Sequence, residues 1–229
     1  MLLDEIGRGA TGVVHRARDL RLRRYVAAKV VRGPDVARLA VEQAHRVDHP
    51  HVLRTLGWAA EDDVALIATE LVHGGSLRDR LARQGPLPGP EVALLLGQLL
   101  DALVAVHAAG LVHGDVKPAN LLLCSGPRPH LLLADFGVAA RAGVPAALAG
   151  TPSFLPAERL AGEPPHPSQD VYAAGLVARR ALAGPAPLLT LCDSMTRTDP
   201  GRRPSAADAL RRLRELAGPE LGVGVPRPG

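Results

Sequence analysis

The stretch HGDVKPAN, residues 113–120, decides how this chain is interpreted, because it puts a carboxylate, an ammonium and an amide in one short loop. These side chains belong to Asp115, Lys117 and Asn120, and a further acid, Asp135, follows twenty residues after Asp115. A carboxylate in such a loop can take the proton of an acceptor hydroxyl while a lysine steadies a phosphoryl group. The oxygens of Asn120 and Asp135 are of the kind that Mg²⁺ prefers. The stretch therefore indicates phosphoryl transfer, and the alternative is an ordinary polar loop with an Asx turn.

The rarity of these residue types elsewhere in the chain favours the chemical interpretation. Of the 27 basic residues 25 are Arg, and the two lysines are Lys29 and Lys117; Asn120 is the single asparagine. Arg does not replace Lys where a compact ammonium is required, since its planar guanidinium is larger and directs its hydrogen bonds differently. In a chain so rich in Arg, we expect the remaining lysines to stand at positions with a chemical role.

Lys29 lies in a predicted buried strand, YVAAKVV at residues 25–31. A lysine there is costly unless its charge meets a phosphate or a carboxylate; the alternative is an edge-strand lysine with a solvated head. The glycine-rich stretch GRGATG, residues 7–12, precedes it, and glycines let a backbone bend closely over phosphates. The residues that follow, VVHRAR, form a strand pattern rather than the helix of a dinucleotide-binding turn. Together these features predict a hairpin lid over a nucleotide.

Composition limits the classes of protein to which the chain can belong. With 229 residues, 47% of them hydrophobic and 22% charged, it is expected to form one compact domain or two small lobes rather than a disordered chain. The net charge of +4 would suit a nucleic-acid partner. Single-strand binders need aromatic stacking platforms, however, and only 2% of the residues are aromatic. We therefore expect no nucleic-acid partner.

No membrane segment is expected either. The longest apolar stretch, residues 92–106, is interrupted by Gln98 and Asp101 and is shorter than the roughly 18 residues of a membrane span. The first residues show no secretory signal, and the two cysteines make no disulfide framework. These features predict a cytoplasmic protein.

The order of patterns along the chain predicts two lobes that meet near Gly74. Short apolar runs of strand type fill the first third, and helical patterns fill the rest, including a long one that begins at Pro90. We expect a domain at residues 1–217, with lobes at 1–72 and 74–217, and a disordered Gly- and Pro-rich tail at 218–229. The expected strands are residues 1–7, 12–17, 25–31, 52–58 and 64–71, and the expected helices are residues 34–47, a short run from 76, 90–109, 169–183, 187–197 and 205–217, the last with a capping box of Ser205 and Asp208.

A series of segments in order resembles the eukaryotic-type (Hanks-type) protein kinases, especially their bacterial serine/threonine members. The resemblance implies an α+β, bilobal fold, with a small antiparallel β-sheet and one helix in the N-lobe and a mainly α-helical C-lobe. It also implies transfer of the γ-phosphate of ATP, held with Mg²⁺ or alternatively Mn²⁺, to a Ser or Thr hydroxyl of a protein substrate or of the chain itself. Besides the glycine loop, the segments are VAAK (26–29), HPHVL (49–53), TELVHGGSL (69–77), HGDVKPANLLL (113–123), ADFG (134–137), GTPSFLPAE (150–158), DVYAAG (170–175) and DPGRRPSA (199–206).

The resemblance also implies a role for individual residues. Asp115 would be the catalytic base, Lys117 would steady the transferring phosphoryl group, and Lys29 would hold the α- and β-phosphates. Asn120 and Asp135 would be the metal ligands. The ATP-binding residues it implies are Ile6, Gly7, Gly9, Gly12, Val14, Ala27, Lys29, Thr69, Glu70, Val72, Leu122 and Asp135.

Around the adenine, the resemblance puts Thr69 at the gatekeeper position before a hinge at residues 70–72, with Ala27 and Leu122 as the apolar residues on either side of the ring. The structural or regulatory residues it implies are Glu42, Phe136, Gly137, Glu158 and Arg203.

The chain departs from the family pattern in three places outside the catalytic loop. Glu42 is the available partner for Lys29, but the shortened segment would put Ala40 in the usual register. The family's Ala-Pro-Glu appears as Pro-Ala-Glu, with Glu158 retained and Arg203 as its expected ion-pair partner. Between residues 184 and 199 the chain is too short for the family's usual extra helix.

Gly114 stands where most protein kinases have an Arg that pairs with a phosphate on the activation loop. The loop itself, VAARAGVPAALAG at residues 138–150, has no Ser, Thr or Tyr. We therefore expect activity without loop phosphorylation, with control through expression, a partner or the segment around Glu42. The alternative is that Gly114 marks a weak enzyme whose loop never orders.

Two other functions remain open on the sequence alone. Aminoglycoside-type phosphotransferases also use a His-Gly-Asp loop followed by an Asn, although the glycine lid, Lys117 and the DFG triplet favour a protein kinase. A pseudokinase that binds without turnover usually lacks one of the key Lys, Asp or Asn residues, and here all are present.

Overall fold

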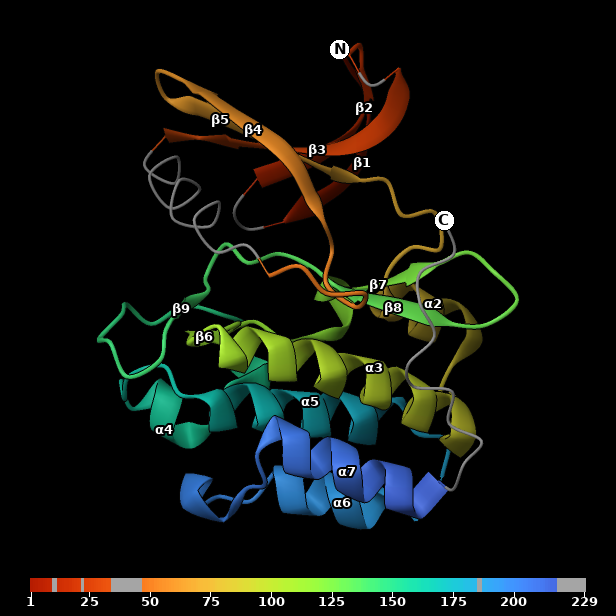
Figure 1. Cartoon of the computed structure of the whole chain (residues 1–229), viewed down its shortest axis with the longest axis vertical. Helices are drawn as coiled ribbons and strands as arrows, with labels where there is room; N and C mark the ends of the chain where they lie inside the picture. The colour runs from red at the N-terminus through yellow and green to blue at the C-terminus, as the bar shows by residue number, and fades with distance from the viewer. Residues whose placement is uncertain (10–11, 22, 34–46, 185–186, 218–229) are drawn as a thin grey trace.

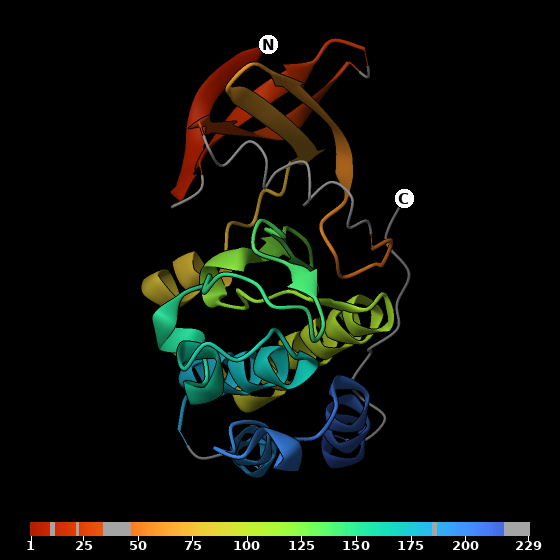
Figure 2. The ribbon, with the colours of Figure 1, turned by 90° about the vertical axis from the view of Figure 1, so that its left-hand side faces the viewer.

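In the computed structural model, residues 1–9, 12–21, 23–33, 47–184 and 187–217 are described. A twisted β-sheet from the N-terminal third stands above a larger, mainly helical part (Figure 1). A second view, turned by 90°, shows the same two layers, with helices α6 and α7 farthest from the sheet (Figure 2). The expected helix at residues 34–47, apart from its last residue, and the expected tail at 218–229 lie outside the described residues.

The N-terminal sheet has five antiparallel strands in the order β1-β2-β3-β5-β4. Buried residues alternate with half-buried ones along its central strand β3 from Val26 to Val30, and this pattern is typical of a strand buried mainly on one face. Four of the five predicted strands are confirmed to within two residues at each end. The strands are β1 (Leu2–Gly9), β2 (Gly12–Asp19), β3 (Arg24–Arg32), β4 (Thr55–Glu61) and β5 (Val64–Glu70).

The predicted strand at residues 52–58 is wrong at its beginning. Val52 is 4% exposed, belongs to the core of the helical part and forms an isolated parallel bridge with Leu133. Leu53 N donates to Leu133 O over 2.9 Å, and Leu133 N donates to His51 O over 2.8 Å. The apolar residues here bury themselves against the helical part, so the sheet strand begins only at Thr55. Residues 51–55 thus connect the helical part, through the hydrogen bonds to Leu133, with strand β4 of the sheet.

Register puts Lys29 on the sheet face that also carries Val31, Ala65 and Ile67. Residues directly opposite each other in an antiparallel pair share a face, as do residues two apart on one strand. Ala27 is on this same face, two residues before Lys29. Because Lys29 contacts Asp135 of the helical part, this face is the one turned toward that part.

The helical part is built around α3, most of whose residues are buried and which packs against α5, α7 and β8. By length and composition alone α3 could cross a membrane, but burial of this kind is what the core helix of a globular part shows. The remaining elements are α2 (Leu77–Gln84), α3 (Gly89–Ala108), β6 (Leu111–Val112), η2 (Pro118–Asn120), β7 (Leu121–Cys124), β8 (His130–Leu133), β9 (Ala140–Arg141), η3 (Pro152–Phe154), α4 (Ala157–Leu160), α5 (Pro167–Ala181), α6 (Leu188–Met195), η4 (Pro200–Arg202) and α7 (Ala206–Ala217).

Side-chain caps fix where two of the helices begin. Ser76 accepts a hydrogen bond from Asp79 N at the start of α2, while Asp79 accepts one from Ser76 N. The predicted cap of α7 is confirmed, since Ser205 Oγ accepts from Asp208 N over 3.1 Å. Each cap satisfies a main-chain donor that the first turn of a helix leaves free.

Gly74 lies between β5 and α2, where the chain passes from the sheet to the helical part, and it has no room for a side chain. A Cβ there would stand 2.1 Å from Leu123 O. We therefore expect Gly74→Ala to lower the free energy of unfolding by about 1–3 kcal/mol, because the main chain of β7 would have to shift. Urea denaturation would measure this. Gly57→Ala is the control, since nothing lies within 4 Å of a Cβ at Gly57; equal effects of the two substitutions would contradict the expectation.

Candidate active site

A short hairpin brings two of the predicted metal ligands to the same edge. Asn120 directly precedes β7, and Asp135 comes two residues after the end of β8. The two strands pair with Leu121 opposite Leu133, and Ala134 N donates to Asn120 O over 2.9 Å. Antiparallel pairing thus sets Asn120 opposite Ala134, the residue directly before Asp135.

Asp115 lies at the centre of a polar network. It is 9% exposed, and its Oδ1 accepts a hydrogen bond from Thr151 Oγ1 over 2.8 Å. Lys117 Nζ lies 2.6 Å from Asp115 Oδ2 and donates to Thr151 Oγ1 over 2.7 Å. Asn120 Nδ2 donates to Asp115 Oδ2 and to its main-chain oxygen, both over 2.9 Å. The three polar residues of the loop are therefore in mutual contact, with a hydroxyl already against the carboxylate.

Lys29 reaches down from β3 to the second acid, Asp135. Lys29 Nζ lies 2.6 Å from Asp135 Oδ1. Burial raises the pKa of Asp135, but the charge and hydrogen bond of Lys29 outweigh it and hold that pKa below its ordinary value. Asp135 has a φ of 67°, in the left-handed region, where a non-glycine residue is uncommon. The contact joins the sheet to the helical part across the site.

Asp170, on α5, supports the loop from behind. Its Oδ2 accepts from His113 N over 2.8 Å and its Oδ1 from Gly114 N over 2.9 Å, while His107 Nε2 lies 3.0 Å from Oδ2. Burial raises the pKa of Asp170, yet the hydrogen bond of His107 and the main-chain donors keep that pKa below its ordinary value. The charged form is thus favoured, and its stabilising effect is present above the ordinary pKa and lost as the pH falls through the depressed one.

His113 connects this loop to the segment of Asp135. The ring Nε2 of His113 lies 3.1 Å from Ala134 O, and its ring meets that of Phe136 edge to face at 4.8 Å between centroids. Gly137 N donates to Asp135 Oδ1 over 3.4 Å. Phe136 therefore packs beneath the loop and fixes the place of the acid beside it.

The N-terminal sheet carries most of the residues predicted to bind the adenine and phosphates. Val14 of β2 pairs with Lys29, and Ala27 pairs with Thr69 near the end of β5. Glu70 ends β5, and Leu122 lies in the middle of β7. In the glycine turn, Gly7 pairs with Val14 and Gly9 with Gly12, while Ile6 is exposed on the edge strand. Val72 lies between β5 and α2.

Glu42 lies outside the described residues, so its pairing with Lys29 stays a prediction.

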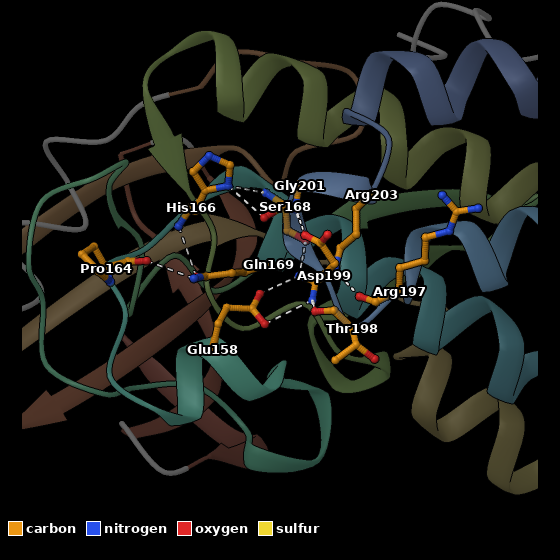
Figure 3. A network of polar contacts seen from close by, with 10 residues as sticks. All are labelled: Glu158, Pro164, His166, Ser168, Gln169, Arg197, Thr198, Asp199, Gly201 and Arg203. Carbon is orange, nitrogen blue, oxygen red and sulfur yellow. Dashed lines mark hydrogen bonds and ion pairs between the residues drawn. The ribbon is translucent and has the colours of Figure 1, made fainter.

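Glu158 and Arg203 form a buried ion pair at the base of the helical part (Figure 3). Arg203 Nη1 lies 2.6 Å from Glu158 Oε1, and Nη2 donates to Oε2 over 3.1 Å. The guanidinium also donates to the main-chain oxygens of Arg197, Thr198 and Ser168. This pair anchors the short helix α4 to the turn before α7.

The donor set fits a hard divalent cation that takes further ligands from phosphate and water. Within the described residues no three His, Cys, Asp or Glu side chains are gathered into a metal site. Asn120 and Asp135 instead carry the side-chain oxygens that would hold such a cation. The Nδ2 group of Asn120 is engaged as a donor to Asp115, so its Oδ1 is the acceptor turned to the other side.

Sequence comparison identifies the family. Residues 1–190 match the family profile described as protein kinase domain. The chain belongs to the protein kinase family. The predicted α+β kinase fold and the predicted family are thereby confirmed, and protein kinases as a family use ATP with a divalent metal and act on protein substrates.

Several relatives of this kinase are serine/threonine-protein kinases by name. It is 32% identical to the serine/threonine-protein kinase PkaA of Streptomyces coelicolor over 98% of this chain and 50% of the relative. It is 32% identical to PknL of Mycobacterium tuberculosis over 80% of this chain and 49% of the relative. It is also 32% identical to ULK3 of Xenopus laevis over 82% of this chain and 42% of the relative. The kinase chain thus spans about half the length of these curated relatives or less.

Two contacts of the kinase site escaped analysis of the sequence. Thr151 was recognised as part of the GTPSFLPAE segment, but its bonds to Asp115 and Lys117 were not foreseen. Asp170 was part of the DVYAAG segment without a role of its own. Its partners are two main-chain N–H groups, which every residue type carries, and the ring of His107, so only its acidic character in a buried helix was available as a signal.

Proposed function

We propose that the chain is an ATP-dependent serine/threonine protein kinase, which transfers the γ-phosphate of ATP to a Ser or Thr hydroxyl of a protein, its own hydroxyls included. The observation that carries this proposal is the contact of Thr151 Oγ1 with Asp115 Oδ1. It demonstrates that a hydroxyl fits against this carboxylate as a hydrogen-bond donor, which is the arrangement a general base needs.

In the proposed mechanism the oxygen of the acceptor hydroxyl attacks the γ-phosphorus of ATP, and Asp115 accepts the proton of that hydroxyl. The bond from the γ-phosphorus to the β-phosphate oxygen breaks, and ADP leaves. Lys117, between Asp115 and Thr151, places a positive charge next to the transferring group. Lys29 exchanges its contact with Asp135 for the α- and β-phosphates of the nucleotide. Asn120 and Asp135 would hold Mg²⁺, or Mn²⁺ in its place, and the metal supplies charge neutralisation on the phosphates.

A transfer assay with γ-labelled ATP and Mg²⁺ or Mn²⁺ tests the proposal. The acceptors are the chain itself, a basic protein and small amino sugars, and acid hydrolysis identifies the labelled amino acid. We expect label on Ser or Thr of a protein. Label on the amino sugar alone would instead support the phosphotransferase alternative, and nucleotide binding without any transfer would support a binding module.

Lys29→Met is expected to lower kcat/KM by about 10²-fold or more, because the phosphates lose the group that positions them. The folded state should persist, since methionine fills the same space in β3. Steady-state kinetics would measure the loss, and Arg32→Met, at the exposed end of the same strand, is the control. Activity equal to that of the unmodified chain would overturn the assignment of Lys29.

A further inference from the structure

Arg159, on the short helix α4, is a buried cation that has no carboxylate partner among the described residues. The residue is only 6% exposed, and within the described part of the chain no Asp or Glu lies within ion-pair distance of it. A buried guanidinium is costly unless its N–H groups are satisfied. Here they are satisfied by main-chain oxygens: Nη2 donates to Ala147 O over 2.6 Å and Nη1 to Glu163 O over 2.8 Å, with longer contacts of 3.4 and 3.5 Å to Ala146 O.

Two of the carbonyl groups that Arg159 binds, those of Ala146 and Ala147, belong to the segment that leads into the site. On the N-terminal side, this segment is fixed by the pairing of β6 with β9 and by Gly143 N, which donates to Pro165 O over 2.8 Å. Residues 145–149 make no other hydrogen bond to the described chain than those from Arg159. Without that guanidinium, residues 145–149 would have no hydrogen bond to the rest of the described chain.

Downstream, the same segment reaches the catalytic loop within a few residues. A Cβ at Gly150 would stand 2.4 Å from Gly114 O, so the two main chains are in close contact. The next residue, Thr151, contacts both Asp115 and Lys117. Arg159 also lines, together with Gly114, Asp115 and Thr151, a small cavity beneath the segment. A shift of the main chain at residues 146–147 would therefore move Thr151, whose hydroxyl contacts the carboxylate of Asp115.

We propose that Arg159 is a positioning residue, which holds residues 145–150 in the arrangement that places Thr151 on Asp115 without any phosphate on the segment. The inference rests on the proposed function. The segment has no Ser, Thr or Tyr between residues 138 and 150, and Gly114 offers no cation to a phosphate. A guanidinium bound to main-chain oxygens can order the segment as a phosphate paired with an Arg would. Its charge-assisted hydrogen bonds need no phosphorylation.

Two variants test Arg159, each compared with a matched control. Arg159→Lys keeps the charge but loses the fork that contacts three carbonyl groups, and Arg159→Gln loses both the charge and the fork. Arg179→Gln removes an exposed arginine of α5, whose partner is Asp193. Amide hydrogen exchange of residues 142–150 is measured with and without ATP, together with the ATP affinity and with kcat/KM for the protein acceptor identified in the transfer assay.

We expect exchange at residues 142–150 to rise about tenfold or more in both Arg159 variants, with α3 and α5 unchanged. The value of kcat/KM for the acceptor should fall about tenfold or more, while the affinity for ATP stays within about twofold. Phosphatase treatment of the unmodified chain should leave its rate unchanged.

Unchanged exchange at residues 142–150 in Arg159→Lys and Arg159→Gln would overturn the proposal, as would a loss of activity on dephosphorylation that autophosphorylation restores. If Arg159→Gln does not fold, Arg159→Lys decides, because it keeps the buried charge. If the unmodified chain transfers no phosphate, the proposed function fails, and hydrogen exchange still decides whether Arg159 orders the segment.

Discussion

Asp115→Asn is expected to lower kcat for phosphoryl transfer by about 10³-fold and to leave the affinity for ATP nearly unchanged. Asparagine has the same size, so the bonds from Thr151 and Asn120 can be kept in part. What it lacks is an acceptor for the proton of the attacking hydroxyl. The carboxylate faces Thr151 and Lys117, away from the adenine positions on the sheet, so nucleotide binding should not depend on it.

Nucleotide titration and steady-state rates on the same preparation would separate binding from turnover. Asp193→Asn, an exposed acid on α6, is the control for a change of charge alone. A variant that loses binding and turnover to the same extent would show that Asp115 supports the fold of the loop rather than the reaction.

The sequence predicted a strand correctly where the strand packs in the sheet formed by its neighbours along the chain. It failed where an apolar residue packs in a distant part of the molecule. Strands β1, β2, β3 and β5 have short apolar runs between turn residues, and the structure has them where they were expected. Val52 has the same local pattern, yet it enters the core of the helical part through its bridge to Leu133. No local pattern distinguishes an apolar residue buried in one part of the molecule from one buried in the other.

The site shows the same division. Asp115, Lys117 and Asn120 share one loop, so their proximity follows from sequence distance alone, and the structure brings them into contact. Asp170 acts through the main-chain N–H groups of His113 and Gly114, and Arg159 acts through carbonyl groups. Contacts of this kind depend on the tertiary path of the chain, because every residue offers the same main-chain groups. The sequence could name the chemistry of the loop but not what holds the loop in place.

Glu158→Gln should give the largest loss of stability among the substitutions considered, about 3–5 kcal/mol in the free energy of unfolding. The side chain of Arg203 is 1% exposed, so without the carboxylate its charge stays buried next to a neutral amide. The three main-chain oxygens satisfy the hydrogen bonds of the guanidinium only in part. The ring of Tyr172, whose centre lies 4.9 Å from the guanidinium carbon, adds a cation–π contact but no carboxylate charge. For a chain of this length Tm should fall by roughly 10 °C.

Glu215→Gln is the matched control, because Glu215 pairs with Arg211 over 3.3 Å on the exposed face of α7. An exposed pair of this kind contributes at most about 1 kcal/mol. The double variant Glu158→Leu with Arg203→Met should recover part of the loss, since apolar side chains replace both charges at once. If Glu158→Gln were no more harmful than Glu215→Gln, the buried pair would not be what anchors α4, and Arg159 would hold the segment from a helix fixed by other contacts. If the loss is large, the ion pair fixes α4, and the hold of Arg159 on residues 146–147 depends on it.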